Sequence, residues 1–262
     1  MSAAIFIKTW RDDMKWMPYA MESIRRFASG FEEIVIAADS SCYDESVRLY
    51  GSEARVVQCQ EWANGYVQQQ AVKLDAGRLV GMRHEYVLFV DSDCVFHTPF
   101  SPESFMRDGL PVLMKTPYGD LGGAEAWRSI TSNAVGFDVE FEYMRRLPWM
   151  YRTSSLVNFS VKYQSLVRSL SQMTTRDFSE FNALGAYIDR FESEQYYITD
   201  TREWVPDAVA HQFWSWGGIT EEVATQIRSF IPGFEVRVDT SQQSGSKSRE
   251  PKLVRRVRKG LR

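Results

Sequence analysis

Cysteine, histidine and long apolar runs are scarce in this sequence of 262 residues. Its three cysteines, Cys42, Cys59 and Cys94, are odd in number and widely spaced, which argues against a disulfide framework and against a cysteine-bound metal. No apolar run reaches the roughly 20 residues that cross a bilayer, and residues 1–5 lack the basic and apolar regions of a signal peptide. These absences predict a cytoplasmic protein.

The composition is that of a chain with a large core, because 44% of the residues are hydrophobic and 14% are aromatic. The length allows one large α/β domain or two small ones. The net charge of −3 is unevenly distributed. Eight basic residues and one acid give residues 247–262 a charge of +7, which leaves −10 on the remainder.

Strands and helices alternate in the first hundred residues. Apolar segments predict strands over residues 5–7, 34–38, 54–59 and 86–90, and helices are predicted over 14–27 and 65–80. This alternation predicts an α/β fold with a parallel, doubly wound sheet. Later in the chain, we expect a strand over 112–116 and helices over 140–146, 160–170 and 182–191.

Residues 242–250 are polar and poor in apolar side chains, which is typical of a solvated linker. We therefore predict a single domain over residues 1–241, of which residues 1–100 form a nucleotide-binding half. Residues 242–262 are predicted to be a polar linker followed by a basic amphipathic tail.

Two carboxylates, Asp91 and Asp93, follow directly after the apolar strand predicted over residues 86–90. The carboxyl end of a central strand is where open α/β sheets bind ligands. Carboxylate oxygens suit Mg²⁺ or Mn²⁺, which bind a few carboxylates together with a substrate's phosphates. The motif therefore indicates a metal-bridged nucleotide diphosphate. The alternative is an ordinary turn at the end of a strand, since Asp and Ser are common turn formers.

Five segments in this order resemble those of GT-A glycosyltransferases, especially bacterial and phage members with a Gly-Tyr-x-x-Gln-Gln segment. They are residues 5–13, Gly65–Leu74, Asp91-Ser92-Asp93, Phe178-Ser179-Glu180-Phe181 and His211-Gln212-Phe213-Trp214. The similarity covers roughly residues 4–220. It implies a GT-A-like, Rossmann-like, mostly parallel twisted sheet flanked by helices. Residues 101–241 would then form the acceptor half.

The resemblance also implies a metal site for Mn²⁺ or Mg²⁺. Asp93 would be a direct ligand, and Asp91 would bind the metal, a metal-bound water or the donor's ribose. His211 would be the third ligand, chosen from only three histidines in the chain. The alternative for His211 is a structural histidine that binds no metal.

Glu180 is the candidate for the general base that takes the acceptor's proton, because many inverting members of the family place an acid about 90 residues beyond the metal motif. Asp177 is the rival candidate. Such a base must lie within hydrogen-bond reach of the acceptor hydroxyl. The alternative for both residues is capping of the helix that follows.

The remaining candidates would bind the donor. The loop after the first strand would line the nucleotide pocket, and Lys73 shares a helix face with Gln69, from which it would meet phosphate. Solvated lysines, ion-paired arginines and core tryptophans are the ordinary alternatives. The predicted donor-binding residues are Thr9, Trp10, Asp12, Asp13, Asp39, Gln69, Lys73, Asp91, Ser92, Arg146 and Trp214.

The expected function is metal-dependent transfer of a sugar from a nucleotide-sugar, with UDP-sugars favoured, to a saccharide or lipid-linked glycan. One alternative is a phage-type DNA glycosyltransferase that acts on a hydroxymethylated base, and another is a non-catalytic nucleic-acid or membrane binding module. The basic tail would place the enzyme on the inner membrane surface or on DNA, or would simply be solvated. The absence of a Gly-rich phosphate loop after the first strand argues against a nucleotidyltransferase.

Overall fold

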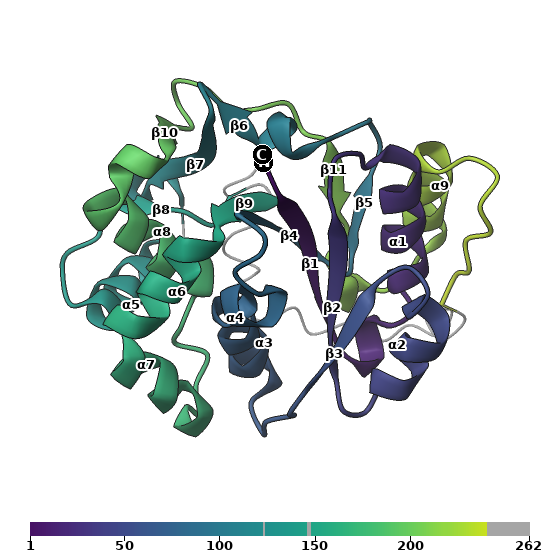
Figure 1. The fold of residues 1–262 in the computed structure, drawn as a ribbon, viewed down its shortest axis with the longest axis horizontal. Coiled ribbons are helices and arrows are strands. Elements are labelled where there is room, and N and C mark those ends of the chain that lie inside the picture. The colour runs from purple at the N-terminus through teal and green to yellow at the C-terminus, as the bar shows by residue number, and fades with distance from the viewer. Residues whose placement is uncertain (123, 146–147, 240–262) are drawn as a thin grey trace.

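The computed structural model describes residues 1–122, 124–145 and 148–239. A five-stranded sheet with the strand order β3-β2-β1-β4-β9 runs through the molecule (Figure 1). β1 to β4 are mutually parallel and β9 is antiparallel to β4, which confirms the α/β class and a mostly parallel sheet. The strands are β1 Ala3–Thr9, β2 Glu33–Asp39, β3 Arg55–Cys59, β4 Tyr86–Asp91 and β9 Trp149–Arg152.

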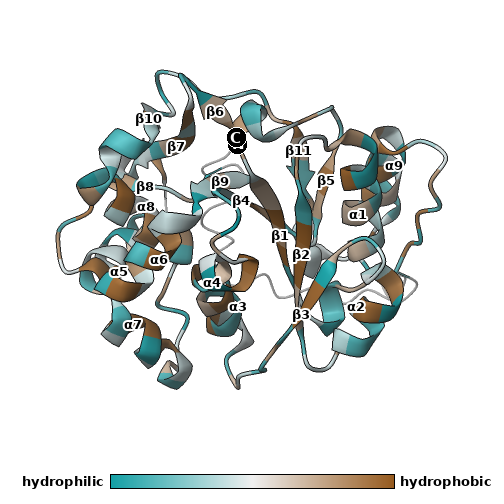
Figure 2. Ribbon diagram, viewed as in Figure 1, coloured by the Kyte–Doolittle hydropathy of each residue, from teal (hydrophilic) through white to brown (hydrophobic). Residues whose placement is uncertain are grey.

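The central strands are buried on both faces, as their apolar sequences predict. Because side chains alternate along a strand, Ile5 and Leu88 enter one core while Phe6 and Phe89 enter the other. The rings of Phe6 and Phe89 lie edge to face, 5.5 Å apart. In the middle of the molecule, the most hydrophobic residues lie along these strands (Figure 2).

Helices cover both faces of the sheet (Figure 1). The core that contains Ile5 is covered by α1 and α2, and α9 packs beside α1 through a third cluster of apolar residues. The core that contains Phe6 is covered by α3, α4, α6 and α8. The helices are α1 Met17–Phe27, α2 Tyr43–Tyr50, α3 Gly65–Leu74, α4 Ala76–Val80, α5 Glu125–Val135, α6 Thr153–Lys162, α7 Gln164–Ser169, α8 Glu180–Phe191 and α9 Glu221–Phe230.

A second, smaller sheet forms around β7 Leu110–Pro117. β10 Tyr197–Asp200 pairs with it in parallel, while β6 Met106–Arg107 and β8 Phe141–Glu142 are antiparallel to it. Directly after the Asp-Ser-Asp motif, β5 Cys94–Phe96 pairs with β11 Ala210–Gln212. This ribbon brings a late segment of the chain to the end of β4.

Three of the predicted helices differ from the structure. Residues 140–146 were expected to be helical, but Phe141–Glu142 is strand β8, because it completes hydrogen bonding along the carboxyl end of β7. The helix predicted over 65–80 is two helices separated at Asp75. The one predicted over 160–170 is divided at Tyr163 between α6 and α7.

None of the helices in the described ranges combines the length and the apolarity that spanning a bilayer requires. The predicted linker and basic tail, residues 242–262, lie outside the described residues. The division into a donor half and an acceptor half stays a prediction.

Candidate functional site

The carboxyl ends of β1, β2 and β4 bring acidic residues together at one edge of the sheet. Asp39 ends β2, Asp91 ends β4, and Asp13 closes the 3-10 turn Arg11–Asp13 that follows β1. β1 lies between β2 and β4, with Lys8 paired in register to Asp91. Because these strands are parallel, their carboxyl ends place the three acidic residues at the same edge of the sheet.

Asp93 is held by the segment that follows β11. Its side chain is buried, and Oδ2 accepts a hydrogen bond from the backbone N–H of Ser215 at 2.6 Å. Its backbone oxygen accepts one from the N–H of Phe213 at 3.0 Å. The amide Nε2 of Gln212 donates to Asp91 Oδ2 at 3.1 Å and lies 3.5 Å from Asp93 Oδ1. Residues 212–215 thus contact both carboxylates of the motif.

Asp13, Asp91 and Asp93 are close enough for their negative charges to affect one another. Burial raises the pKa of Asp93 to about 7, and the neighbouring charges of Asp91 and Asp13 act in the same direction, while the Ser215 N–H opposes them. Burial also raises the pKa of Asp13, although hydrogen bonds from Ser215, Ser92 and Trp10 oppose it. The Ser92 hydroxyl donates to Asp13 Oδ2 at 3.1 Å. A cation is the ligand such a cluster favours.

Lys73 of α3 joins the two halves of the chain. Its ammonium lies 2.7 Å from Asp91 Oδ1 and 3.3 Å from Glu180 Oε1, and it sits over the ring of Phe181. Burial lowers the pKa of Lys73, but the charges of Asp91 and Glu180 outweigh burial and hold it above its usual value. Lys73 was predicted to meet phosphate, whereas here its charge is directed to two carboxylates.

Glu180 is the first residue of α8 and is only 6% exposed. Its backbone N–H donates to Gln70 Oε1 at 3.0 Å, so α3 and the start of α8 are bonded directly. Burial raises the pKa of Glu180, and the charge of Lys73 opposes that rise. Asp177 is exposed, and the N-cap position of α8 belongs to Ser179. Neither acid is the capping residue.

The negative charge of Asp39 is already paired with a lysine of the protein. Its Oδ1 accepts hydrogen bonds from Lys8 Nζ at 2.7 Å and from Gln68 Nε2 at 2.8 Å, and all three side chains are buried. Gln69 was predicted to bind the donor, but it is half-buried, whereas its neighbour Gln68 donates to Asp39 and Gln70 accepts from the Glu180 N–H. An apolar-face pattern could have identified them, since they flank buried Val67 and Ala71.

The first loop contributes residues of differing exposure. Thr9 is buried, Asp12 is exposed, and Trp10, which is hydrogen-bonded to Asp13, is 47% exposed. Trp214 is 49% exposed and has a φ of +60°, an unusual backbone conformation for a bulky side chain. The bonds that its neighbours Phe213 and Ser215 make to Asp93 hold it there. Arg146 lies outside the described residues.

Gln212, rather than the predicted third ligand His211, contacts both carboxylates of the motif, so the structure gives the His211 prediction no support. Successive residues of a strand face opposite sides, and on β11 it is Gln212 that faces Asp91. The His211 ring packs 4.6 Å from that of Phe213 and 6.1 Å from that of Phe230, and burial together with His97 lowers its pKa. In the described ranges, no three or more His, Cys, Asp or Glu side chains are grouped to hold a metal ion.

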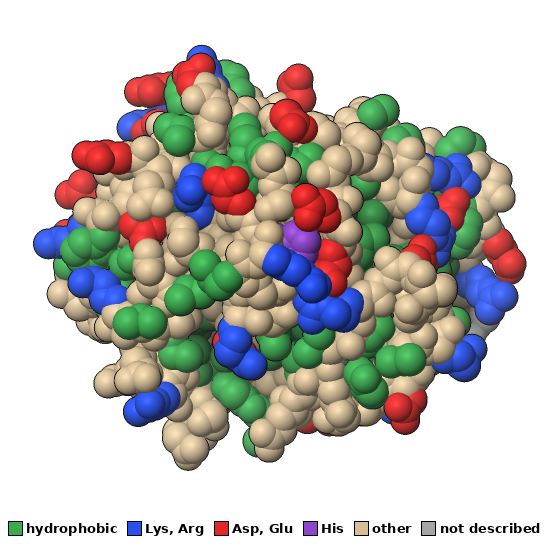
Figure 3. All heavy atoms as spheres, viewed as in Figure 1, with side chains coloured by type: hydrophobic (Ala, Val, Ile, Leu, Met, Phe, Trp, Pro, Cys, Tyr) green, Lys and Arg blue, Asp and Glu red, His purple; other side chains and the backbone are tan. Residues whose placement is uncertain are grey.

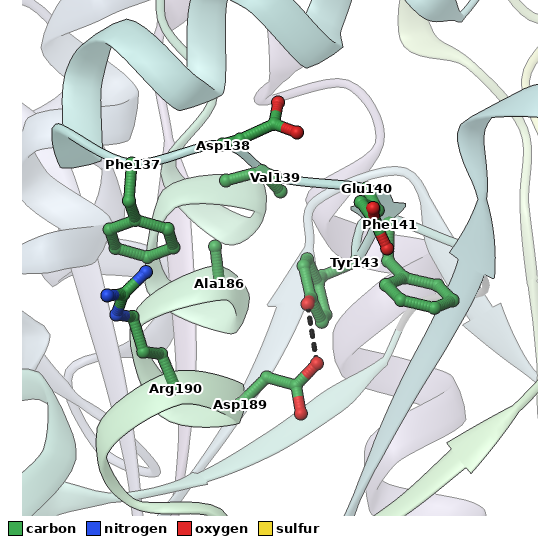
Figure 4. A pocket seen from close by; sticks show the side chains of 9 residues that line it. All are labelled: Phe137, Asp138, Val139, Glu140, Phe141, Tyr143, Ala186, Asp189 and Arg190. Atoms are coloured by element: carbon green, nitrogen blue, oxygen red, sulfur yellow. Dashed lines mark hydrogen bonds between the residues drawn. The ribbon is translucent and has the colours of Figure 1, made fainter.

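A separate cavity of about 400 Å³ lies between the segment before β8 and the second half of α8 (Figure 4). Asp189 projects towards it and accepts hydrogen bonds from Tyr143 and Lys115. Asp189 follows Glu180 by nine residues, which is two and a half helical turns, so the two acids point to opposite sides of α8. The cavity is therefore not part of the candidate site.

A second charged cluster lies at the amino end of the sheet, opposite the site. Glu33 at the start of β2 pairs with Arg55, Arg83 and His84. Burial raises the pKa of Glu33, but these arginines lower it further, to about 2. On the face shown in Figure 3, acidic and basic side chains are interspersed in the same way. Glu33 has its charged partners within the protein, so we interpret this cluster as structural.

No protein-family model matches this sequence, and a search of curated proteins finds no match.

Proposed function

We propose that this protein is a metal-dependent glycosyltransferase of the GT-A fold, which moves a sugar from a nucleotide-sugar to an acceptor hydroxyl. The observation that carries the proposal is the bridge from Asp91 through Lys73 to Glu180. It places a buried acid of the second half beside the carboxylate pair that ends the central strand. Paired carboxylates for a diphosphate-bound cation and a nearby acid for the acceptor are the two groups this reaction needs.

The oxygen ligands offered by the side chains of the site fit a hard divalent cation. Asp91 and Asp93 offer carboxylate oxygens, and Mg²⁺ or Mn²⁺ binds one or two carboxylates together with substrate phosphates. Burial raises the pKa of Asp93, and the neighbouring negative charges of Asp91 and Asp13 raise it further, so a bound cation would relieve this repulsion. When bound, the cation would supply charge neutralisation to the departing diphosphate.

The chain's own residues would supply positioning and proton transfer. The acceptor oxygen forms a bond to the anomeric carbon while the bond from that carbon to the diphosphate oxygen breaks, and the acceptor proton passes to Glu180. Burial raises the pKa of Glu180, which makes it a better base than an exposed glutamate. The exposed rings of Trp10 and Trp214 offer flat faces for the base or the sugar.

We favour a saccharide or a lipid-linked glycan as the acceptor and a UDP-sugar as the donor. The second candidate acceptor is a hydroxymethylated base in DNA, which the charge of +7 on residues 247–262 favours. Either acceptor presents a hydroxyl group, so the same residues would serve.

The direct test is release of nucleoside diphosphate from a panel of nucleotide-sugars, with Mn²⁺ and with EDTA. We expect hydrolysis of at least one donor that requires Mn²⁺ and is lost in Asp93→Asn. The matched control is Asp207→Asn, which alters an exposed aspartate and should behave as the parent. Failure of every donor with Mn²⁺ present, in a folded parent protein, would contradict the proposal.

A further inference from the structure

Gln212 lies where the third ligand of the predicted metal site was expected. Its side-chain amide contacts Asp91 Oδ2 at 3.1 Å and approaches Asp93 Oδ1 at 3.5 Å. The neighbouring His211 points to the other side of β11, against Phe213 and Phe230. The residue that faces both carboxylates is therefore an amide and not an imidazole.

The backbone determines this placement. Gln212 is paired in register with Cys94 on β5, and Cys94 directly follows the motif. The N–H of Phe213 donates to the backbone oxygen of Asp93, and the N–H of Ser215 holds Asp93 Oδ2. These bonds leave Asp93 Oδ1 directed towards Gln212. A shift of one residue in the β5–β11 pairing would be needed to exchange Gln212 for His211.

An amide side chain can bind either an anion or a cation. One end of it donates through two N–H groups, and the other end accepts through a carbonyl oxygen. Facing two carboxylates, Gln212 presents Nε2. Facing a cation held by the same carboxylates, rotation of the amide by half a turn presents Oε1 in nearly the same position. Hard divalent cations accept Gln carbonyl oxygens as ligands.

We propose that Gln212 is a metal ligand, which completes with Asp91 and Asp93 an all-oxygen site for a divalent cation. The inference rests on the metal dependence of the proposed function and adds a ligand to it. Its chemical consequence is a preference for Mn²⁺ and Mg²⁺, because oxygen ligands suit these ions while imidazole suits Zn²⁺ and other later metals. The phosphates of a nucleotide diphosphate and water would occupy the other positions.

The test is Mn²⁺ binding to the full chain, followed by electron paramagnetic resonance with and without UDP. Gln212→Leu should weaken Mn²⁺ binding by about tenfold, which corresponds to one lost ligand of about 1.4 kcal/mol. Gln212→Glu should bind Mn²⁺ at least as tightly as the parent, because it supplies an oxygen and a charge. His211→Asn is the matched control and should bind as the parent does. Thermal melting of each variant checks that it is folded.

A spectroscopic readout does not depend on any variant. The electron spin echo of Mn²⁺ on the parent chain should show no directly coordinated ¹⁴N, whereas a histidine ligand would produce that coupling. A ¹⁴N ligand, or parent-like affinity in Gln212→Leu, would overturn the inference while leaving metal-dependent transfer intact. If the parent protein hydrolyses the donor only with Mn²⁺ and Gln212→Leu binds Mn²⁺ as tightly as the parent, the role of Gln212 is refuted but the proposed function is not. A parent that binds no Mn²⁺ even with UDP would overturn both proposals.

Discussion

At the scale of single residues, Asp93 combines deep burial with an incomplete set of partners. Its carboxylate accepts a hydrogen bond from the Ser215 N–H at 2.6 Å and a long one from Gln212 at 3.5 Å, and it lies near two other acids. Proteins seldom keep such a group unless it binds something, because ionising a buried acid beside like charges is unfavourable. The same feature makes the stability of the protein depend on pH.

In EDTA, the contribution of Asp93 to stability should fall as pH rises from about 4 to about 7. The folded pKa is raised to about 7 from 3.8, so within this window the folded state keeps a proton that the unfolded state has released. Each unit of difference corresponds to about 1.4 kcal/mol. Urea unfolding at several pH values should show Asp93→Asn gaining stability relative to the parent up to about pH 7. If the difference in unfolding free energy between Asp93→Asn and the parent stayed constant from about pH 4 to about pH 7, the raised pKa of Asp93 would be contradicted.

Replacing Glu180 separates its proposed catalytic role from its structural one. Glu180→Gln keeps the shape of the side chain but removes its basicity, so turnover should fall by about 100-fold or more while donor binding stays near that of the parent. Donor binding is measured by thermal shift with nucleotide diphosphate and Mn²⁺. Glu222→Gln, which changes an exposed residue of α9, is the control. Turnover within a few-fold of the parent would move the base elsewhere or indicate a retaining mechanism.

Lys73 should matter for stability as well as for function. Lys73→Met leaves Asp91 and Glu180 without their shared ammonium, and unpairing a buried charge costs on the order of 3 kcal/mol. Lys15→Met removes an exposed ion pair with Asp239 and should cost less than about 1 kcal/mol. Urea unfolding of the two variants gives the comparison. Equal losses would show that the bridge contributes no more than a surface pair.

At the scale of elements, the contact between α8 and the segment after β8 depends on a glycine. A Cβ placed at Gly185 would clash with the Cβ and Cγ of Tyr143. Tyr143 is bonded to α8 through its N–H to Asn182 and its hydroxyl to Asp189, so it has little room to move. This close approach aligns α8, whose first residue is Glu180.

We expect Gly185→Ala to destabilise the protein by about 1–3 kcal/mol, although alanine favours helix more than glycine does. The matched control is Gly65→Ala at the start of α3, where an added Cβ meets nothing within 4 Å. Thermal and urea unfolding provide the measurement. If Gly185→Ala were as stable as the control, Tyr143 would have to move away from the added Cβ without loss of stability.

At the scale of the whole molecule, the charge asymmetry of the sequence distinguishes the two acceptor classes. Removing residues 247–262 takes away a charge of +7. The candidate site residues lie at or before Ser215, so donor hydrolysis should be unchanged in the truncated protein. What should change is binding to an anionic acceptor or surface.

If the acceptor is DNA, binding by the parent should weaken steeply with salt and the truncated protein should show a shallower slope. If it is a lipid-linked glycan, the truncation should abolish binding to anionic vesicles, and neither form should bind DNA appreciably. Salt titrations of both forms with duplex DNA and with vesicles give the result. Identical behaviour of the two forms on both surfaces would contradict any role of the tail in acceptor recognition.

The four parallel strands of the main sheet and the position of the motif could be predicted from the sequence, whereas the antiparallel edge strand β9 could not. Apolar runs in β1, β2 and β4 indicate strands buried on both faces, and their alternation with helices indicates parallel pairing. Because the carboxyl ends of parallel strands lie at one edge of a sheet, the sequence also predicts that Asp39 and Asp91 lie at the same edge. These features depend on local periodicity, which a single sequence displays.

The side chains that surround the motif depend on long-range packing, which local sequence patterns do not reveal. The register of β11 against β5 turned Gln212 inwards and His211 outwards, and the packing of α3 against α8 placed Lys73 between Asp91 and Glu180. Residues 141–142 became a strand because β7 had an edge to pair. Each of these outcomes depends on partners far away in the chain, and a one-residue shift reverses which face a strand's side chain occupies.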